Sequence, residues 1–88
     1  MEKFLIDVRE AIEPAMKEMD IIVDDVEYLL ENNYNFLRIT LDKVNGIDLD
    51  TIVAATNVIN PIIDTFDVID DSYILDVISK ERGDVNNG

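Results

Sequence analysis

The sequence Tyr-Asn-Phe-Leu-Arg-Ile-Thr-Leu-Asp at residues 34–42 decides the fold. Leu37, Ile39 and Leu41 alternate with polar neighbours, so one side of this segment is apolar and the other polar. That period is typical of a β-strand covered on one side. An Asn-Gly pair then interrupts the strand, and a helical pattern begins at Asp48. A one-sided strand followed by a capped helix indicates a two-layer α+β sandwich.

The segment before this strand predicts a helix and a hairpin. Apolar residues at helical spacing predict a first helix over residues 2–18, weakened locally at Pro14. The alternation of a first strand, Ile21–Leu30, changes phase at Asp24-Asp25, which predicts a β-bulge. Asn32-Asn33 then supplies the turn of an antiparallel hairpin.

The segment after it predicts a second helix and a third strand. We expect Asp48 to be the N-cap of the helix, and Pro61 predicts that the helix bends or ends near Asn60. In the third strand Ile74 and Ile78 lie on the face opposite Tyr73, Leu75 and Val77, so this strand is either covered on both sides or exposes an apolar strip to a partner. The residues expected on the inner face of the second helix are Leu49, Ile52, Val53, Thr56, Ile59, Ile63 and Phe66.

The predicted order is therefore α-β-β-α-β. The third strand should run in the same direction as the second, and both helices should pack on one face of a three-stranded sheet. We expect the domain to span residues 1–80 and residues 81–88, which are polar, to form a flexible tail.

Composition narrows the functional classes. The chain has 88 residues, 48% of them hydrophobic, which suits one globular domain with a modest core. It contains no cysteine and no histidine, so thiol nucleophiles, imidazole bases and the usual zinc sites are excluded. No apolar run approaches the roughly 20 residues that cross a bilayer. We expect a cytoplasmic, non-enzymatic protein without a cofactor.

Charge is the strongest compositional signal. Seven basic residues against twenty acidic ones give a formal net charge of −13. Such a surface repels nucleic acids and anionic membranes, because binding to phosphates depends on cations. It favours a basic protein partner, although an acidic surface that serves solubility alone explains the composition equally well.

Individual charged residues give weaker signals. The acidic pairs Asp24-Asp25 and Asp70-Asp71 lack the spacing and glycine of a calcium loop, so we expect no metal site. Arg38 is expected to pair across the strands with an acid of the first strand, such as Glu27. The Gly-x-x-Gly loop of RNA-binding KH domains is absent.

Four segments occur in the order of a known family: Asp25-Val-Glu-Tyr28, Leu37-Arg-Ile-Thr-Leu-Asp-Lys43, Gly46-Ile-Asp-Leu-Asp50 and Tyr73-Ile-Leu-Asp-Val-Ile-Ser79. Together with the initial helix they resemble the N-terminal domain of the bacterial ribosome maturation factor RimP family. The resemblance implies a non-enzymatic assembly factor that binds precursors of the 30S subunit and assists maturation around ribosomal protein S12.

The family usually continues through a Ser-Pro-Gly segment into a second, β-barrel-like domain. Here Ser79 is followed by Lys-Glu-Arg-Gly, so we expect that second domain to be absent from this sequence. Either the sequence is a fragment cut at the domain boundary, or it is a naturally short relative.

The expected partner is a basic ribosomal protein of the 30S precursor, with little or no direct nucleic-acid binding by this domain. The residues expected to contact it are Asp24, Asp25, Arg38, Asp42, Asp70, Asp71, Ile74, Asp76 and Ile78.

Two alternatives from other functional classes remain. Asp71-Ser72-Tyr73 resembles the modified serine site of acyl carrier proteins, which would make Ser72 the attachment point of a phosphopantetheine arm in a helical bundle. The acidic composition also fits a nucleic-acid mimic that blocks a basic protein.

Overall fold

The computed structural model describes residues 2–66 and 73–80. Its elements follow the predicted order α-β-β-α-β. They are α1 (Glu2–Glu18), β1 (Ile22–Glu31), β2 (Tyr34–Asp42), α2 (Leu49–Ile63) and β3 (Ile74–Ser79). The tail predicted at residues 81–88 lies outside the described residues.

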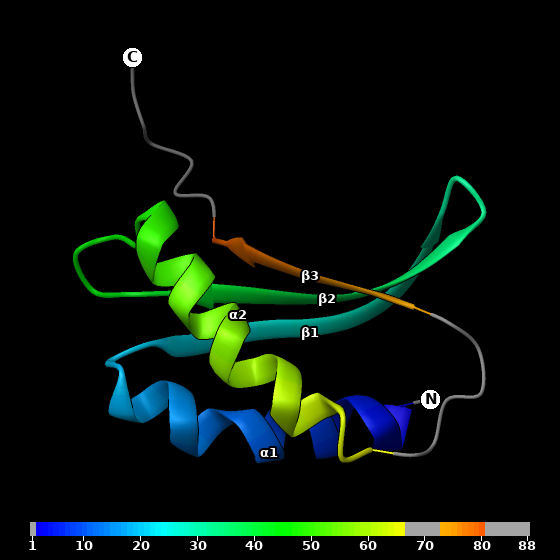
Figure 1. Ribbon diagram of the computed structural model, residues 1–88, viewed down its shortest axis with the longest axis horizontal. Coiled ribbons are helices and arrows are strands. Elements are labelled where there is room, and N and C mark those ends of the chain that lie inside the picture. Colours follow the sequence, from blue (N-terminus) through cyan, green and yellow to red (C-terminus); the bar gives the residue numbers. More distant parts are fainter. Residues whose placement is uncertain (1, 67–72, 81–88) are drawn as a thin grey trace.

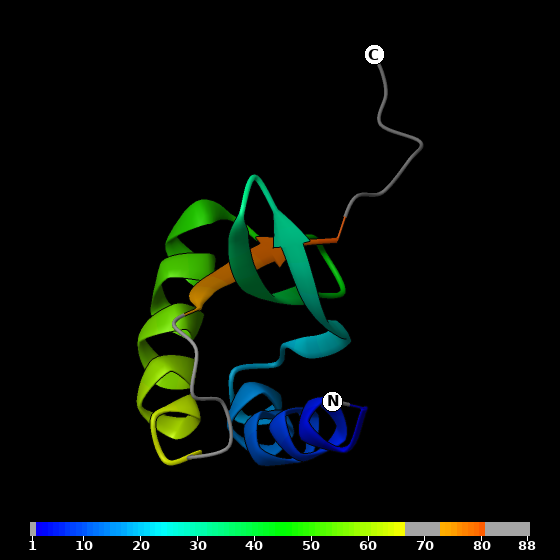
Figure 2. The same ribbon diagram turned by 90° about the vertical axis from the view of Figure 1, so that its right-hand side faces the viewer.

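The three strands form one mixed sheet in the order β1-β2-β3. β1 and β2 are antiparallel, and β3 runs parallel to β2, as predicted. Figures 1 and 2 show α1 and α2 on one side of this sheet, while no described helix covers the opposite side. The α+β sandwich predicted from the sequence is confirmed.

Local backbone features fix the register of the hairpin. Asn32 and Asn33 both have positive φ, 51° and 68°, which matches the mirror-image turns that connect twisted strands most readily. The register shifts between Val23 and Asp25, so Asp24 is an extra residue in β1. The predicted bulge is therefore confirmed, and it keeps the apolar residues on both sides of it pointing to the core.

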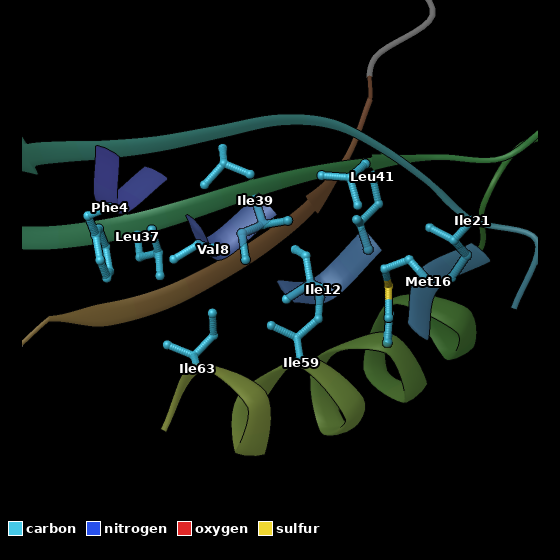
Figure 3. Packing of buried hydrophobic residues seen from close by; sticks show 13 residues of the cluster. Phe4, Val8, Ile12, Met16, Ile21, Leu37, Ile39, Leu41, Ile59 and Ile63 are labelled. Atoms are coloured by element: carbon cyan, nitrogen blue, oxygen red, sulfur yellow. The ribbon is translucent and has the colours of Figure 1, made fainter. Parts of the chain in front are cut away.

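The core lies between the sheet and the two helices (Figure 3). Leu37, Ile39 and Leu41 from the inner side of β2 are fully buried, and Ile12 from α1 and Ile59 from α2 meet them there. The complete buried cluster is Phe4, Val8, Ile12, Met16, Ile21, Val23, Val26, Leu37, Ile39, Leu41, Ala55, Ile59 and Ile63.

α2 begins as predicted but ends later. The Asp48 side chain accepts a hydrogen bond of 2.8 Å from the Thr51 N–H, so Asp48 is the N-cap. This bond from Thr51 also holds the pKa of Asp48 below its ordinary value. The predicted end near Asn60 is wrong, because the helix continues through Pro61 to Ile63. Pro61 lies in the last turn, where it removes one hydrogen bond and no following turn depends on it.

The inner face of α2 also differs from the prediction. Leu49 and Val53 are 76% and 52% exposed, although the sequence pattern assigned both to the core. Ala55 is fully buried instead, in line with Ile59 and Ile63 at a spacing of four residues. The rest of the predicted face is confirmed, since Ile59 and Ile63 are buried and Ile52 and Phe66 pack against the core. Ala55 was missed because a small side chain gives little hydrophobic signal.

Candidate functional site: the uncovered face of the sheet

The outer side of the sheet is left open by the described helices. Because side chains alternate along a strand, the residues between the buried positions of β2 point to this side. Leu29, Phe36 and Ile74 are direct neighbours in the register of the three strands. They form an apolar row across the whole sheet, with Ile74 45% exposed. We call this side the uncovered face.

A charged row lies next to the apolar one. Arg38 sits in register between Glu27 and Asp76, and its Nε donates a 2.8 Å hydrogen bond to the Asp76 carboxylate. Its Nη2 lies 3.2 Å from Oε1 of Glu31. The guanidinium carbon is 6.0 Å from the centre of the Phe36 ring, so the side chain runs along that ring toward the hairpin end. Arg38 thereby links all three strands.

The prediction that Arg38 pairs with an acid of the first strand is confirmed, but the suggested residue is corrected. The acid on the first strand is Glu31, not Glu27, although Glu27 is the register neighbour. An extended arginine side chain reaches past its neighbour, and the Phe36 ring supports that direction. Hydrogen bonds to Asp76 and then Glu31 raise the pKa of Arg38, so its charge is permanent.

A third row completes the face. Asp25, Thr40 and Ile78 are register neighbours, and Ile78 is 38% exposed. Of the two options for β3, the structure shows the exposed apolar strip, made of Ile74 and Ile78. These side chains flank the ion pair of Asp76, so the face alternates apolar and acidic character along β3.

Most of the sequence-predicted contact residues meet on this face. Asp24, the bulge residue, bonds Lys80 at 3.2 Å across the end of the sheet. Asp70 and Asp71 lie outside the described residues. The residues that the register brings onto the uncovered face are Asp25, Arg38, Asp42, Ile74, Asp76 and Ile78.

Sequence reasoning did not select several members of this face. Strand register places Leu29 and Phe36 beside Ile74, and an ion pair joins Glu31 to Arg38. The alternation around Arg38 already placed Phe36 on the polar side of its strand, and that was the available signal.

The positive charge of the domain is largely paired. Lys3, Arg9, Arg38 and Lys80 each lie within 3.3 Å of a carboxylate oxygen. These pairs leave the acidic excess to dominate the electrostatic potential, so the described surface offers no cluster of cations for phosphate groups.

Within residues 2–66 and 73–80, no group of three or more acidic side chains is arranged to hold a metal ion. No helix in this part of the chain is long and apolar enough to cross a membrane.

These features define a class of protein: a small two-layer α+β domain, acidic, with one face of its mixed sheet uncovered. The sequence pattern of the RimP N-terminal domain matches residues 11–80 of the chain. The chain therefore belongs to the RimP N-terminal domain family, which confirms the resemblance found in the sequence. RimP proteins are ribosome maturation factors that act on the small ribosomal subunit.

Proposed function

We propose that this domain acts in the cytoplasm as a non-enzymatic assembly factor that binds precursors of the 30S subunit. The observation that carries the proposal is family membership over residues 11–80. The fold agrees with a binding role, since it presents an open sheet face with exposed isoleucines.

The uncovered face is the proposed contact surface, and its chemistry fits a basic ribosomal protein. Asp25, Glu27 and Asp42 project from it, and the register places Glu31 and Asp76 beside them. Complementary charge accelerates the encounter and selects the partner. The apolar row supplies surface from which water is excluded when the partner binds. By family resemblance, the proposed protein partner is ribosomal protein S12.

The test is co-sedimentation of the domain with 30S precursor particles at increasing salt. Charges separated by more than the screening length, about 10 Å at 0.1 M salt, stop attracting each other. We expect the bound fraction to fall steeply between roughly 0.05 and 0.3 M salt, because the Debye length falls by more than half over this range. Absence from the particle fraction at low salt would contradict the proposal, and salt-independent binding would contradict its electrostatic part.

A direct assay separates a protein partner from the nucleic-acid mimic. Purified ribosomal protein S12 should bind the domain, and added ribosomal RNA should not displace it if the two contact different surfaces of S12. Displacement by RNA at equal concentration would favour the mimic instead.

The carrier-protein alternative conflicts with the fold. That alternative requires a helical bundle, whereas three of the five described elements are strands of one sheet. Ser72 itself lies outside the described residues.

A further inference from the structure

A groove lies beside β1, the strand at the edge of the sheet opposite to β3. The second half of α1 and the start of β1 enclose it, and its volume is about 660 Å³. Its lining residues are Glu10, Glu13, Pro14, Lys17, Ile21, Ile22 and Val23. We call it the Pro14 groove.

The floor of the groove holds an exposed apolar side chain. Ile21 and Val23 are 4% and 5% exposed and belong to the core, whereas Ile22 between them is 52% exposed. The strand alternation turns Ile22 away from the core, and Ile22 and Pro14 of α1 both line the groove. An apolar group bound in the groove would remove part of both side chains from water.

Proline chemistry adds a hydrogen-bond acceptor to the same groove. α1 continues through Pro14 to Glu18, yet Pro14 has no N–H to donate to the carbonyl oxygen of Glu10. Glu10 and Pro14 both line the groove. The groove therefore combines an apolar floor with a backbone acceptor that lacks its i+4 donor, and a ligand N–H can satisfy that acceptor.

One rim of the groove is held in place by Arg9. Its guanidinium donates hydrogen bonds of 2.8 and 3.0 Å to the carbonyl oxygens of Val23 and Asp24, and lies 3.3 Å from a Glu13 carboxylate oxygen. These bonds tie α1 to β1, so the groove is preformed. They also occupy the outward carbonyls of β1 at this point, which disfavours addition of a further strand and favours insertion of a side chain.

The charged groups around the groove select the ligand. Glu10 and Glu13 are carboxylates of the lining, and Lys17 is its one lining cation. The Glu13 charge is shared with Arg9, whereas Glu10 is exposed and forms no ion pair within the described residues. In a chain of net charge −13, the field at this rim favours a cation placed at the Glu10 end, away from Lys17.

We propose that the Pro14 groove binds an arginine side chain presented beside an apolar residue in a basic protein segment. The aliphatic stem and the neighbouring apolar side chain pack on Pro14 and Ile22. The guanidinium donates to the Glu10 carbonyl oxygen and to the Glu10 carboxylate, a geometry that suits its several fixed donors. This site is distinct from the strip of Ile74 and Ile78 and does not depend on the proposed ribosomal role.

The test uses the whole chain, labelled with ¹⁵N, and a short peptide of alternating arginine and leucine at 0.15 M salt. We expect shifts of backbone amide signals in residues 10–17 and 21–23. Pro14→Ala restores the missing helix hydrogen bond and removes the free acceptor, so it should weaken binding about fivefold. Because alanine favours helix, this variant should keep the fold.

Three further measurements sharpen the result. Ile22→Ser should weaken peptide binding about tenfold through lost apolar contact. Lys17→Gln should strengthen it, since a repelling cation is removed. A control peptide with serine in place of leucine should bind more weakly, which separates insertion from general attraction of a polycation.

Ile6→Ser in the first half of α1, where the side chain is 53% exposed, is the matched control and should leave peptide affinity unchanged. Peptide shifts that map to β3, or affinities unaltered by Pro14→Ala and Ile22→Ser, would overturn the proposal. Neither outcome bears on co-sedimentation with 30S precursors, so this proposal and the ribosomal one can fail separately.

Discussion

The two sides of β2 differ sharply in burial. Leu37, Ile39 and Leu41 on the inner side are fully buried, whereas Phe36 and Arg38 on the outer side remain partly exposed. The same nine residues thus contribute both to the core and to a candidate binding surface. Because successive side chains point to opposite faces, stability and binding should be separable by mutating adjacent positions.

The largest expected effect comes from the inner side. Ile39→Ala removes a fully buried side chain from between the sheet and both helices. We expect the free energy of unfolding to fall by about 2 to 5 kcal/mol, a large part of the stability of a small domain. Urea denaturation followed by circular dichroism measures it.

Thr40→Ala, one residue further along β2, is the matched control. It lies on the uncovered face and should change the free energy of unfolding by about 0.5 kcal/mol or less. Equal losses in the two variants would contradict the distinction between the faces.

An intermediate effect is expected in the connection that leads to α2. Gly46 has φ of +88°, which side-chain-bearing residues adopt with strain, and a Cβ added there would contact nothing within 4 Å. Gly46→Ala should therefore lower stability by about 1 to 2 kcal/mol through the backbone alone. Urea denaturation measures this loss. Val44→Ala in the same loop, where the side chain is 77% exposed, should stay within about 0.5 kcal/mol of the parent in that experiment.

On the outer side of the sheet, mutations should weaken binding more than they lower stability. The double variant Ile74→Ser with Ile78→Ser alters two exposed side chains, so its stability should fall by less than about 1 kcal/mol. Its binding to 30S precursors should fall at least about tenfold, because the apolar strip is lost from the contact. Sedimentation of both proteins under identical salt conditions makes the comparison. Parent-like binding would remove β3 from the proposed contact.

The smallest effect concerns the cap of α2. The pKa of Asp48 is held below its ordinary 3.8 by the bond from Thr51, so the ionised form is favoured in the folded state. That contribution to stability is complete above the ordinary value and disappears as pH falls through the lowered one. Asp48→Asn keeps a capping oxygen without the titration. Its stability should therefore fall less than that of the parent on acidification below pH 4, measured by thermal melts; identical pH profiles would contradict the assignment.

Much of the fold follows from the sequence because strand period and turn chemistry are local. The alternation around Ile39, the phase change at Asp24-Asp25 and the pair Asn32-Asn33 each determine nearby backbone, and each was confirmed. On α2 the prediction wrongly included Leu49 and Val53 and missed Ala55, whose small side chain gives little hydrophobic signal.

The candidate site was predictable in part. Six of its residues were chosen from the sequence, and register places them on one face. The ion pair of Arg38 with Glu31 and the contribution of Leu29 depend on how strands align in space. Local sequence does not encode that alignment, so these residues required the structure.

The central claim is that the uncovered face contacts the 30S precursor. Isoleucine methyl NMR tests it directly, because Ile74 and Ile78 lie on that face while Ile6, 53% exposed, lies on α1. On addition of 30S precursors we predict that the methyl signals of Ile74 and Ile78 broaden or shift while that of Ile6 does so far less. Selective change at Ile6, with the two β3 signals unaffected, would contradict the account.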